Sequence, residues 1–224
     1  MALRCAINLG IPTAIHRLGG AATLSELHAA LLVAASKRPC LSRIMTLLAT
    51  SGIFKSNFKL YYHLTTASRL LVDDEDTTRG GHPCISQHLA VCSSPFIFTA
   101  SLNLDEWLKE EEDARTAAPF AMAHGAGVYD VVRRDAAFGT CFDEAMASDS
   151  RFVSEIVVRD YGEVFAGVTS VVDVGGHNGT MARAIAKAFP HVRCSVLDLP
   201  RVVDAMPADD TVDILVSFGG INQY

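Results

Sequence analysis

The stretch VVDVGGHNGTMARAIAKAFPHVRCSVLDLP, residues 171–200, constrains the fold of this chain more than any other part. Its apolar start, Val171–Val174, predicts a buried parallel strand, and the glycines that follow predict a sharp turn. An amphipathic helix is expected over Met181–Phe189. A second strand, Cys194–Leu197, ends at Asp198. Strand, glycine turn, helix and strand in this order form the first half of a doubly wound α/β fold.

The glycine turn also predicts a ligand site. Gly175 and Gly176 leave bare backbone where a ligand can approach closely. Asp198 follows Asp173 by 25 residues, close to the spacing at which such folds place an acid on ribose hydroxyls. The acid two residues before the first glycine favours a positive or neutral group near the turn over a pyrophosphate. We therefore interpret the segment as a nucleoside-cofactor site, with a purely structural turn as the alternative.

Composition excludes several classes of function. The formal net charge is −6, which opposes binding to a phosphate backbone, so we expect no nucleic-acid partner. Six cysteines are scattered without a CxxC pair or metal-ligand spacing, which favours reduced thiols, a cytoplasmic location and no metal site. No apolar run reaches the roughly 20 residues of a membrane span.

Residues 1 to 72 predict a compact helical region. Short helices are expected before Gly10 and before Gly19–Gly20. Thr23 and Glu26 have the spacing of a capping box, which predicts a helix that runs to about Ala35. A further helix is expected over Leu41–Thr50, with Ile44, Leu47 and Leu48 facing inward.

Two short strands are predicted next, at Ile53–Phe54 and Leu60–Leu64, and Thr65 is expected to cap a short helix. Three helices followed by a two-stranded wing is the winged-helix order. A winged-helix DNA-binding protein is therefore a candidate class, but the helix over Leu41–Thr50 carries only Arg43 as a cation, and the wing only Lys55 and Lys59. This is too little positive charge for phosphate contacts.

From about residue 86 to residue 168 the pattern is again helical. We predict one helix over Ala137–Ala147 and a separate one, capped by Asp149 or Ser150, that runs through Phe165. After the glycine-turn unit, Val212–Val216 is a plausible third strand. The chain is thus read as α/β: a winged-helix region at 1–72, then a domain at 86–224 with a helical part at 86–168 and a partial Rossmann-like part at 169–224.

Several of these motifs resemble, in the right order, the plant S-adenosylmethionine-dependent O-methyltransferases of the caffeate/flavonoid type. MALRCAINLGIPTAIHRLGG and LTTASRLLV are similar to the winged-helix dimerisation region of that family, and AFGTCFDEAMASDS to its substrate-pocket helix. VVDVGGHNGT with VLDLP is similar to its cofactor motif. The resemblance covers nearly the whole chain. It implies a homodimer formed through the N-terminal region, and methyl transfer to a small phenolic substrate.

The resemblance also implies roles for individual residues. The cofactor S-adenosyl-L-methionine would lie against Asp173, Gly175, Gly176 and Gly179, with Asp198 on its ribose and Leu199 beside it. An aromatic acceptor pocket would be lined by three residues of one helix face: Phe138, Phe142 and Met146. Their four-residue spacing is equally typical of ordinary core packing, so both interpretations stay open.

Three departures from the family pattern matter. His177 stands where the family has glycine, and a positive φ there would cost about 1–2 kcal/mol. Ser217–Gly220 does not match the acid-bearing adenine motif of the family. The catalytic histidine of the family, in its C-terminal half, has no counterpart here, because His124 and His191 belong to other motifs. We therefore assign no catalytic residue, and we expect a C-terminally truncated chain with little or no turnover.

An alternative function from another class is a non-catalytic interaction module. In the family the N-terminal region exchanges helices between subunits, and its apolar content here exceeds what a lone unit of about 70 residues needs. Such a module would pair with intact relatives rather than catalyse a reaction.

Overall fold

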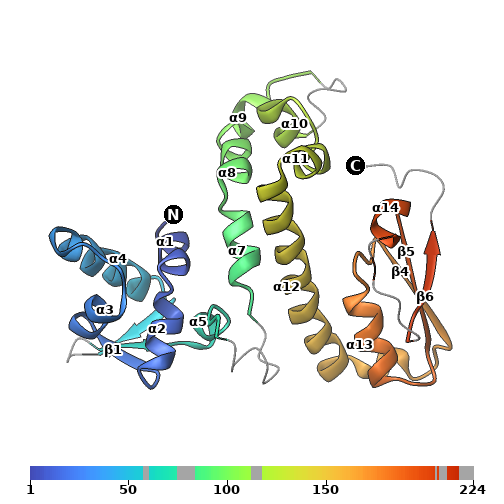
Figure 1. Ribbon diagram of the computed structural model, residues 1–224, viewed down its shortest axis with the longest axis horizontal. Helices are drawn as coiled ribbons and strands as arrows, with labels where there is room; N and C mark the ends of the chain where they lie inside the picture. Colours follow the sequence, from blue (N-terminus) through green and yellow to red (C-terminus); the bar gives the residue numbers. More distant parts are fainter. Residues whose placement is uncertain (58–60, 75–83, 112–117, 205, 207–210, 217–224) are drawn as a thin grey trace. The chain divides into compact units, whose positions relative to one another are not determined.

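The computed structural model describes residues 1–57, 61–74, 84–111, 118–204, 206 and 211–216. These form two compact units, residues 1–146 and 147–224, with the boundary inside one long helix. Figure 1 labels the helices and strands of both. Residues 217–220, where the sequence departs from the family's adenine motif, lie outside the described residues.

The first unit begins with four helices: α1 (Ala2–Asn8), α2 (Ile11–Arg17), α3 (Leu24–Ala30) and α4 (Arg38–Thr50). Gly10, with φ 68°, separates α1 from α2, as expected of a left-handed helix terminator. The predicted capping box at α3 is confirmed: the Glu26 amide donates to the Thr23 hydroxyl at 3.2 Å, and the Thr23 amide donates to the Glu26 carboxylate at 2.7 Å. Thr65 likewise caps α5 (Thr66–Arg69).

The helix α3 is shorter at its C-terminal end than predicted. The helix stops at Ala30 rather than about Ala35, because Leu31 adopts an extended backbone with φ −105° and ψ 146°. A single 3-10 turn, η1 (Ala35–Lys37), precedes α4. Leu32, in the extended segment, is fully exposed. The apolar pattern of the sequence therefore continues beyond Ala30, although the backbone is no longer helical there.

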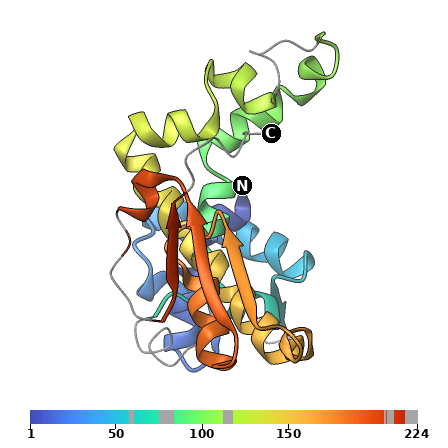
Figure 2. The ribbon, with the colours of Figure 1, turned by 90° about the vertical axis from the view of Figure 1, so that its right-hand side faces the viewer.

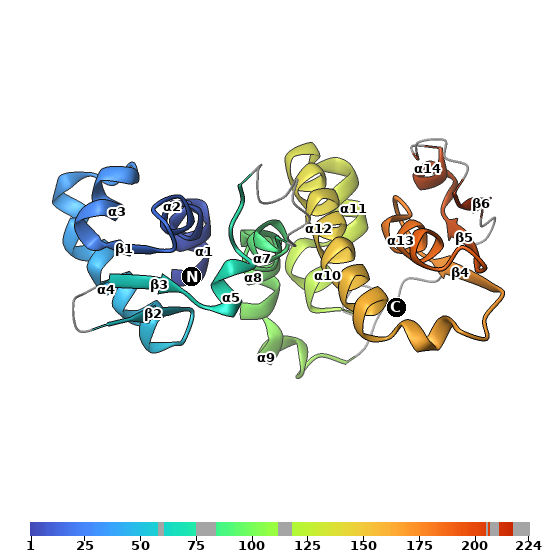
Figure 3. The same cartoon turned by 90° about the horizontal axis from the view of Figure 1, so that it is seen from below.

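A small antiparallel sheet packs with these helices. It contains the two predicted strands, β2 (Phe54–Ser56) and β3 (Tyr61–Leu64), and a third that was not predicted, β1 (Ala21–Thr23). The order is β1–β3–β2, with Tyr62 of the middle strand opposite Ala22 and Ser56 (Figure 3). Three residues are too short a run to show an alternating pattern, so β1 depends on its pairing with β3.

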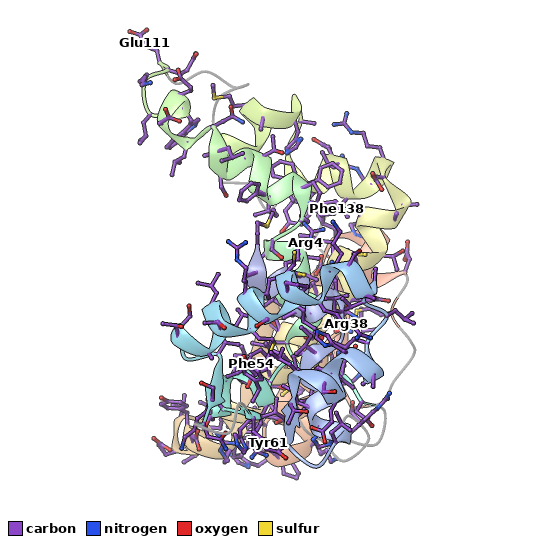
Figure 4. The ribbon with its side chains drawn as sticks, turned by 90° about the vertical axis from the view of Figure 1, so that its left-hand side faces the viewer. Arg4, Arg38, Phe54, Tyr61, Glu111 and Phe138 are labelled. Atoms are coloured by element: carbon purple, nitrogen blue, oxygen red, sulfur yellow. The ribbon has the colours of Figure 1, made fainter. Side chains whose placement is uncertain are left out.

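The sheet and helices enclose one core. Ile11, Ile15, Leu27, Met45 and Phe54 are fully buried, or almost so, and contact one another through this cluster. Figure 4 labels Phe54 within this unit. The inward placement of Leu47 was wrong, since 55% of it is exposed. The core face of α4 is instead formed by Leu41, Met45 and Leu48, with Ile44 packed at its margin.

Further helices of the first unit are α7 (Ser86–Cys92), α8 (Pro95–Leu102), α9 (Leu104–Trp107), α10 (Pro119–His124) and α11 (Val128–Arg134). A second core is built on Val91 of α7, Val131 of α11, and Phe138 and Ala145 of α12 (Ala136–Asp160).

The two helices predicted between residues 137 and 165 form a single helix for most of that length. Helix α12 continues without a break through Ser148, Asp149 and Ser150, and a separate 3-10 turn, η2 (Gly162–Phe165), follows it. The polar run was misread as a cap. Ser148 is 1% exposed and Ser154 donates to the Arg151 carbonyl at 2.9 Å, so these serines are accommodated inside the helix.

The second unit holds a parallel sheet: β4 (Ser170–Val174), β5 (Arg193–Asp198) and β6 (Asp213–Val216), in that order (Figure 2). Helix α13 (Thr180–Ala188) connects β4 to β5, and α14 (Pro200–Val203) follows β5. The predicted third strand is thus confirmed. Residues of α13, β5 and η2 form the core of this unit, including Ala182, Ile185, Val196 and Phe165.

The prediction that the first strand is buried was wrong. In β4, Val172 is 49% exposed and Val174 is 61% exposed, whereas Cys194 and Val196 of β5 are almost fully buried. Among the described residues β4 pairs on one side only, with β5, while β5 has a neighbour on each side. Hydrophobicity of a strand therefore did not reveal which strand lies in the middle.

Candidate functional site

The glycine turn lies at the carboxyl end of β4. Gly175 has φ 75° and Gly179 has φ 72°, so both occupy the left-handed region that glycine enters without strain. The Gly175 amide donates to the Leu197 carbonyl at 2.8 Å, and the Gly179 amide donates to the Gly176 carbonyl at 2.8 Å. The turn is therefore fastened to β5 at its start and closed on itself before α13 begins.

Asp173 lies beneath this turn. A Cβ atom added to Gly176 would come within 2.7 Å of both Cγ and Oδ2 of Asp173, so only glycine fits over the carboxylate. Oδ2 of Asp173 is buried and has no hydrogen-bond partner among the described residues. Burial raises the pKa of this carboxyl group, the Ala182 amide lowers it, and the charge of Asp198 raises it further.

Asp198 ends β5 and is 8% exposed. Oδ2 accepts from the His177 amide at 2.9 Å, and Oδ1 accepts from the Leu199 amide at 2.7 Å. These two bonds fix the carboxylate at the edge of the turn. Each oxygen keeps a lone pair for a further donor, such as a ribose hydroxyl.

His177 is the only residue other than glycine with positive φ in the described part of the chain, at 48°. The backbone strain that we predicted for a positive φ at His177 is therefore present. The same backbone conformation directs its N–H at Asp198. The strained residue thus helps to position the predicted ribose-binding carboxylate.

Sequence reasoning missed a small polar network at the start of α13. Oδ1 of Asn178 accepts from the Thr180 hydroxyl at 2.7 Å and from the Thr180 amide at 3.2 Å, and the Arg183 guanidinium donates to the Asn178 carbonyl. An asparagine two residues before a helix is a recognisable turn signal. Asn178 is therefore the residue from which this network could have been predicted.

The three predicted acceptor residues lie on α12 within the first unit. Phe138 is 6% exposed and contacts Phe96, with ring centroids 4.4 Å apart, and Phe142 lies one turn along with its centroid 6.1 Å from that of Phe138. Met146 packs against the same cluster. The three side chains belong to one cluster on one face of α12, as predicted, and Figure 4 labels Phe138. Their role in acceptor binding stays a prediction.

Three other expectations concern the described residues. Among the described residues no group of three or more histidine, cysteine or acidic side chains could hold a metal ion. In the same residues, no helix combines the length and the apolar character that crossing a bilayer requires. All six cysteines are described, and none forms a disulfide.

A parallel β–α–β unit with a glycine turn at the end of its first strand and a fixed carboxylate at the end of its second defines a Rossmann-like α/β domain. The family comparison specifies the class further. The O-methyltransferase domain matches residues 102–218, and the O-methyltransferase dimerisation domain matches residues 1–74. This chain belongs to the O-methyltransferase family.

Individual relatives agree with this assignment. The chain is 38% identical over 214 residues to 3-O-methylredipecamine 2-O-methyltransferase of Carapichea ipecacuanha, covering 96% of this chain and 57% of that protein. It is 39% identical over 224 residues to 5-pentadecatrienyl resorcinol O-methyltransferase of Sorghum bicolor, covering 93% and 59%. The chain thus spans less than two thirds of the length of these relatives.

The fold has solved counterparts. CalO1, a methyltransferase in calicheamicin biosynthesis whose crystal structure is the SAH-bound form, aligns with a TM-score of 0.76 and 22% identity. The alignment covers 96% of this chain and 61% of CalO1. At this identity the likeness establishes the fold alone.

Proposed function

We propose that this chain binds S-adenosyl-L-methionine at the glycine turn. We propose further that the protein transfers the methyl group of this cofactor to a hydroxyl group of a small phenolic acceptor. The observation that carries the proposal is the pair of carboxylates, Asp173 and Asp198, at the ends of neighbouring parallel strands around bare glycine backbone. Relatives named for methyl transfer to 5-pentadecatrienyl resorcinol and to 3-O-methylredipecamine support the reaction class.

The residues of the turn fit such a cofactor. The fixed oxygens of Asp198 can accept from ribose hydroxyls, and Leu199 follows at the same strand end. Oδ2 of Asp173 is buried next to Gly176 and has no hydrogen-bond partner among the described residues. Its negative charge acts through the glycine backbone, where a cationic group above the turn is favoured. When bound, the cofactor supplies an electrophilic methyl group on a positively charged sulfur.

Gly175, Gly176 and Gly179 have separate roles in this proposal. Gly175 and Gly179 provide positive φ, and Gly176 keeps the space above Asp173 free of side-chain atoms. The acceptor would lie against the face formed by Phe138, Phe142 and Met146, whose apolar surface suits a planar aromatic ring. We retain the domain limits 1–72 for dimerisation and 86–224 for methyl transfer.

Calorimetric titration of the 224-residue chain with S-adenosylhomocysteine tests the cofactor site. We expect a saturable heat with 1:1 stoichiometry in the wild type and none in Asp198→Ala, which removes both fixed oxygens. Asp130→Ala, at an exposed position on α11 in the other unit, is the matched control and should bind like the wild type. A wild-type chain that binds neither this compound nor S-adenosyl-L-methionine contradicts the proposal.

The chain by itself is proposed to transfer methyl groups weakly, because none of its histidines lies in a motif that matches the family's catalytic base. Incubation with radiolabelled S-adenosyl-L-methionine and a panel of phenols measures this directly. Turnover at the level of a complete relative would show that residues 1–224 suffice.

We also propose that the chain pairs through its N-terminal region, as a homodimer or with an intact relative. Leu32 and Leu47 support this, because both are large, apolar and more than half exposed in the first unit. Light scattering after size exclusion should give twice the monomer mass, and Leu32→Asp with Leu47→Asp should reduce it. Glu110→Lys, at another exposed position, is the control. A wild-type monomer at tens of micromolar would overturn pairing with itself. We also propose a cytoplasmic location, because the scattered spacing of the six cysteines is typical of reduced thiols.

A further inference from the structure

His124 is the last residue of α10, and its imidazole ring contacts two helices. Its Nε2 atom lies 2.8 Å from the carbonyl oxygen of Phe96 in the first turn of α8. Because a carbonyl oxygen can only accept, Nε2 carries the proton and donates. The ring also packs against Phe96 and Phe120, with centroid distances of 5.4 Å and 4.5 Å. One side chain therefore joins the end of α10 to the start of α8.

Phe96 connects this contact to the predicted acceptor face. Its ring lies 4.4 Å from that of Phe138, with an interplanar angle of 40°, and it also contacts the ring of His124. Phe138 in turn contacts Phe142 on the next turn of α12. Because packed interiors leave little free volume, a displacement of Phe96 must be taken up by Phe138.

The helix that carries Phe138 makes a close backbone contact with α11. Gly139 packs so closely on α11 that a Cβ atom there would lie 2.7 Å from the Val132 carbonyl oxygen. Helix α12 can therefore come no closer to α11. With α12 held against α11, the Phe138 ring packs on Phe96, and the Phe96 carbonyl accepts the hydrogen bond from His124.

We propose that His124 is a positioning residue for acceptor binding: its Nε2–H fixes the Phe96 backbone, and thereby sets the face that Phe138 and Phe142 present to a planar phenol. The inference rests on the proposed function of that face. It assigns His124 no contact with the acceptor and no proton transfer.

The test compares two replacements that separate the hydrogen bond from the ring. His124→Phe keeps an aromatic ring and loses the N–H, whereas His124→Gln loses the ring and keeps a donor at the equivalent of Nε2. The probe is the fluorescent phenol 7-hydroxycoumarin, titrated into the whole chain with S-adenosylhomocysteine present. We expect His124→Phe to weaken probe binding about fivefold, the effect of one hydrogen bond, and His124→Gln to bind within about twofold of the wild type.

The second unit offers a matched control. His191 makes the same kind of bond, with Nε2 3.0 Å from the carbonyl of Phe165, and its ring contacts Phe189. His191→Phe removes an equivalent bond in the other unit, among residues that do not form the aromatic face, so it should leave affinity for the probe unchanged. The thermal midpoint and the affinity for S-adenosylhomocysteine are measured for all variants, since a merely structural bond would change these and not the probe alone.

Each possible result either supports or overturns the positioning role of His124. Equal probe affinity for His124→Phe and the wild type, or equal losses in His124→Phe and His191→Phe, would overturn the positioning role. If His124→Phe does not fold, His124→Gln decides: binding like the wild type supports the role, and a large loss overturns it. If the wild type binds S-adenosylhomocysteine but no probe, the acceptor face is refuted, and the positioning role with it. If it binds neither, the proposed function fails as a whole.

Discussion

The backbone N–H of His177 donates to Oδ2 of Asp198 across 2.9 Å, from a residue whose φ of 48° is unusual for anything but glycine. A strained position in the turn thus fixes the carboxylate that ends the neighbouring strand. The bond depends on the backbone of residue 177, so a glycine there can make it too. The imidazole adds strain without being needed for the contact.

Replacing His177 with glycine should therefore stabilise the chain. Removing the left-handed strain is worth about 1 kcal/mol, or about 2–4 °C in the thermal midpoint for a chain of this size. His177→Ala is the control, because alanine suffers the same strain and should give no gain. A lower midpoint for His177→Gly would mean that the imidazole makes contacts worth more than the strain.

Adding one methyl group at Gly176 should harm the cofactor site more than adding it at Gly175. At Gly176 the new Cβ meets the Asp173 carboxylate at 2.7 Å and Val196 at 3.1 Å, whereas at Gly175 it meets nothing within 4 Å and suffers only positive φ. We expect Gly176→Ala to lose about 1–3 kcal/mol of stability and most of its cofactor affinity.

Denaturant unfolding and calorimetry measure both effects. Gly127→Ala is the matched control, because its nearest atom, Oδ2 of Asp130, would be at an ordinary 3.7 Å. Unchanged cofactor affinity in Gly176→Ala would mean that Asp173 and the turn can separate without consequence for the ligand.

Affinity for S-adenosyl-L-methionine should rise with pH. Burial raises the pKa of Asp173 above the usual range of an aspartate, so the carboxylate is fully charged only above that raised pKa. A cationic sulfonium is favoured by the charged form, so its affinity should increase as pH passes upward through the raised pKa and then level off. Asp173→Asn should flatten this profile.

The neutral thioether of S-adenosylhomocysteine separates this effect from general damage. Asp173→Asn should weaken S-adenosyl-L-methionine about threefold to tenfold more than S-adenosylhomocysteine at pH 7, since only the former carries the sulfonium charge. The charge of Asp173 has the opposite effect on folding stability. The raised pKa means that the charged carboxylate destabilises the fold above it, so Asp173→Asn should unfold at a higher temperature at neutral pH. Equal losses for both ligands would contradict the electrostatic role.

The cysteines should differ in reactivity. Cys194 is 2% exposed, and burial together with the charge of Asp173 raises the pKa of its thiol, so little reactive thiolate is present. Cys40, Cys92 and Cys141 are exposed. Brief treatment with iodoacetamide at pH 8, followed by peptide mass spectrometry, should label these three and spare Cys194. Early labelling of Cys194, which lies on the central strand β5, would show that the sheet of the second unit opens readily.

The sequence by itself determined the features that depend on neighbours along the chain. The capping box at Thr23, the terminator at Gly10 and the order of β4, α13 and β5 were all predicted, because caps, glycine conformations and helix periodicity act within a few residues. Asp173 and Asp198 were predicted to lie at the same edge of the sheet, because each acid lies near the carboxyl end of one of two successive parallel strands. The family resemblance was carried by these local motifs.

Only the tertiary structure decided what depends on distant partners. The strand β1 exists through its pairing with β3, Val172 is half exposed on a strand that pairs on one side only among the described residues, and α12 continues through the buried Ser148. The burial of Asp173 below Gly176 and the bond from His177 to Asp198 likewise join separate parts of the chain. A local pattern contains no information about which surfaces meet, and burial, pairing and strain are set by those meetings.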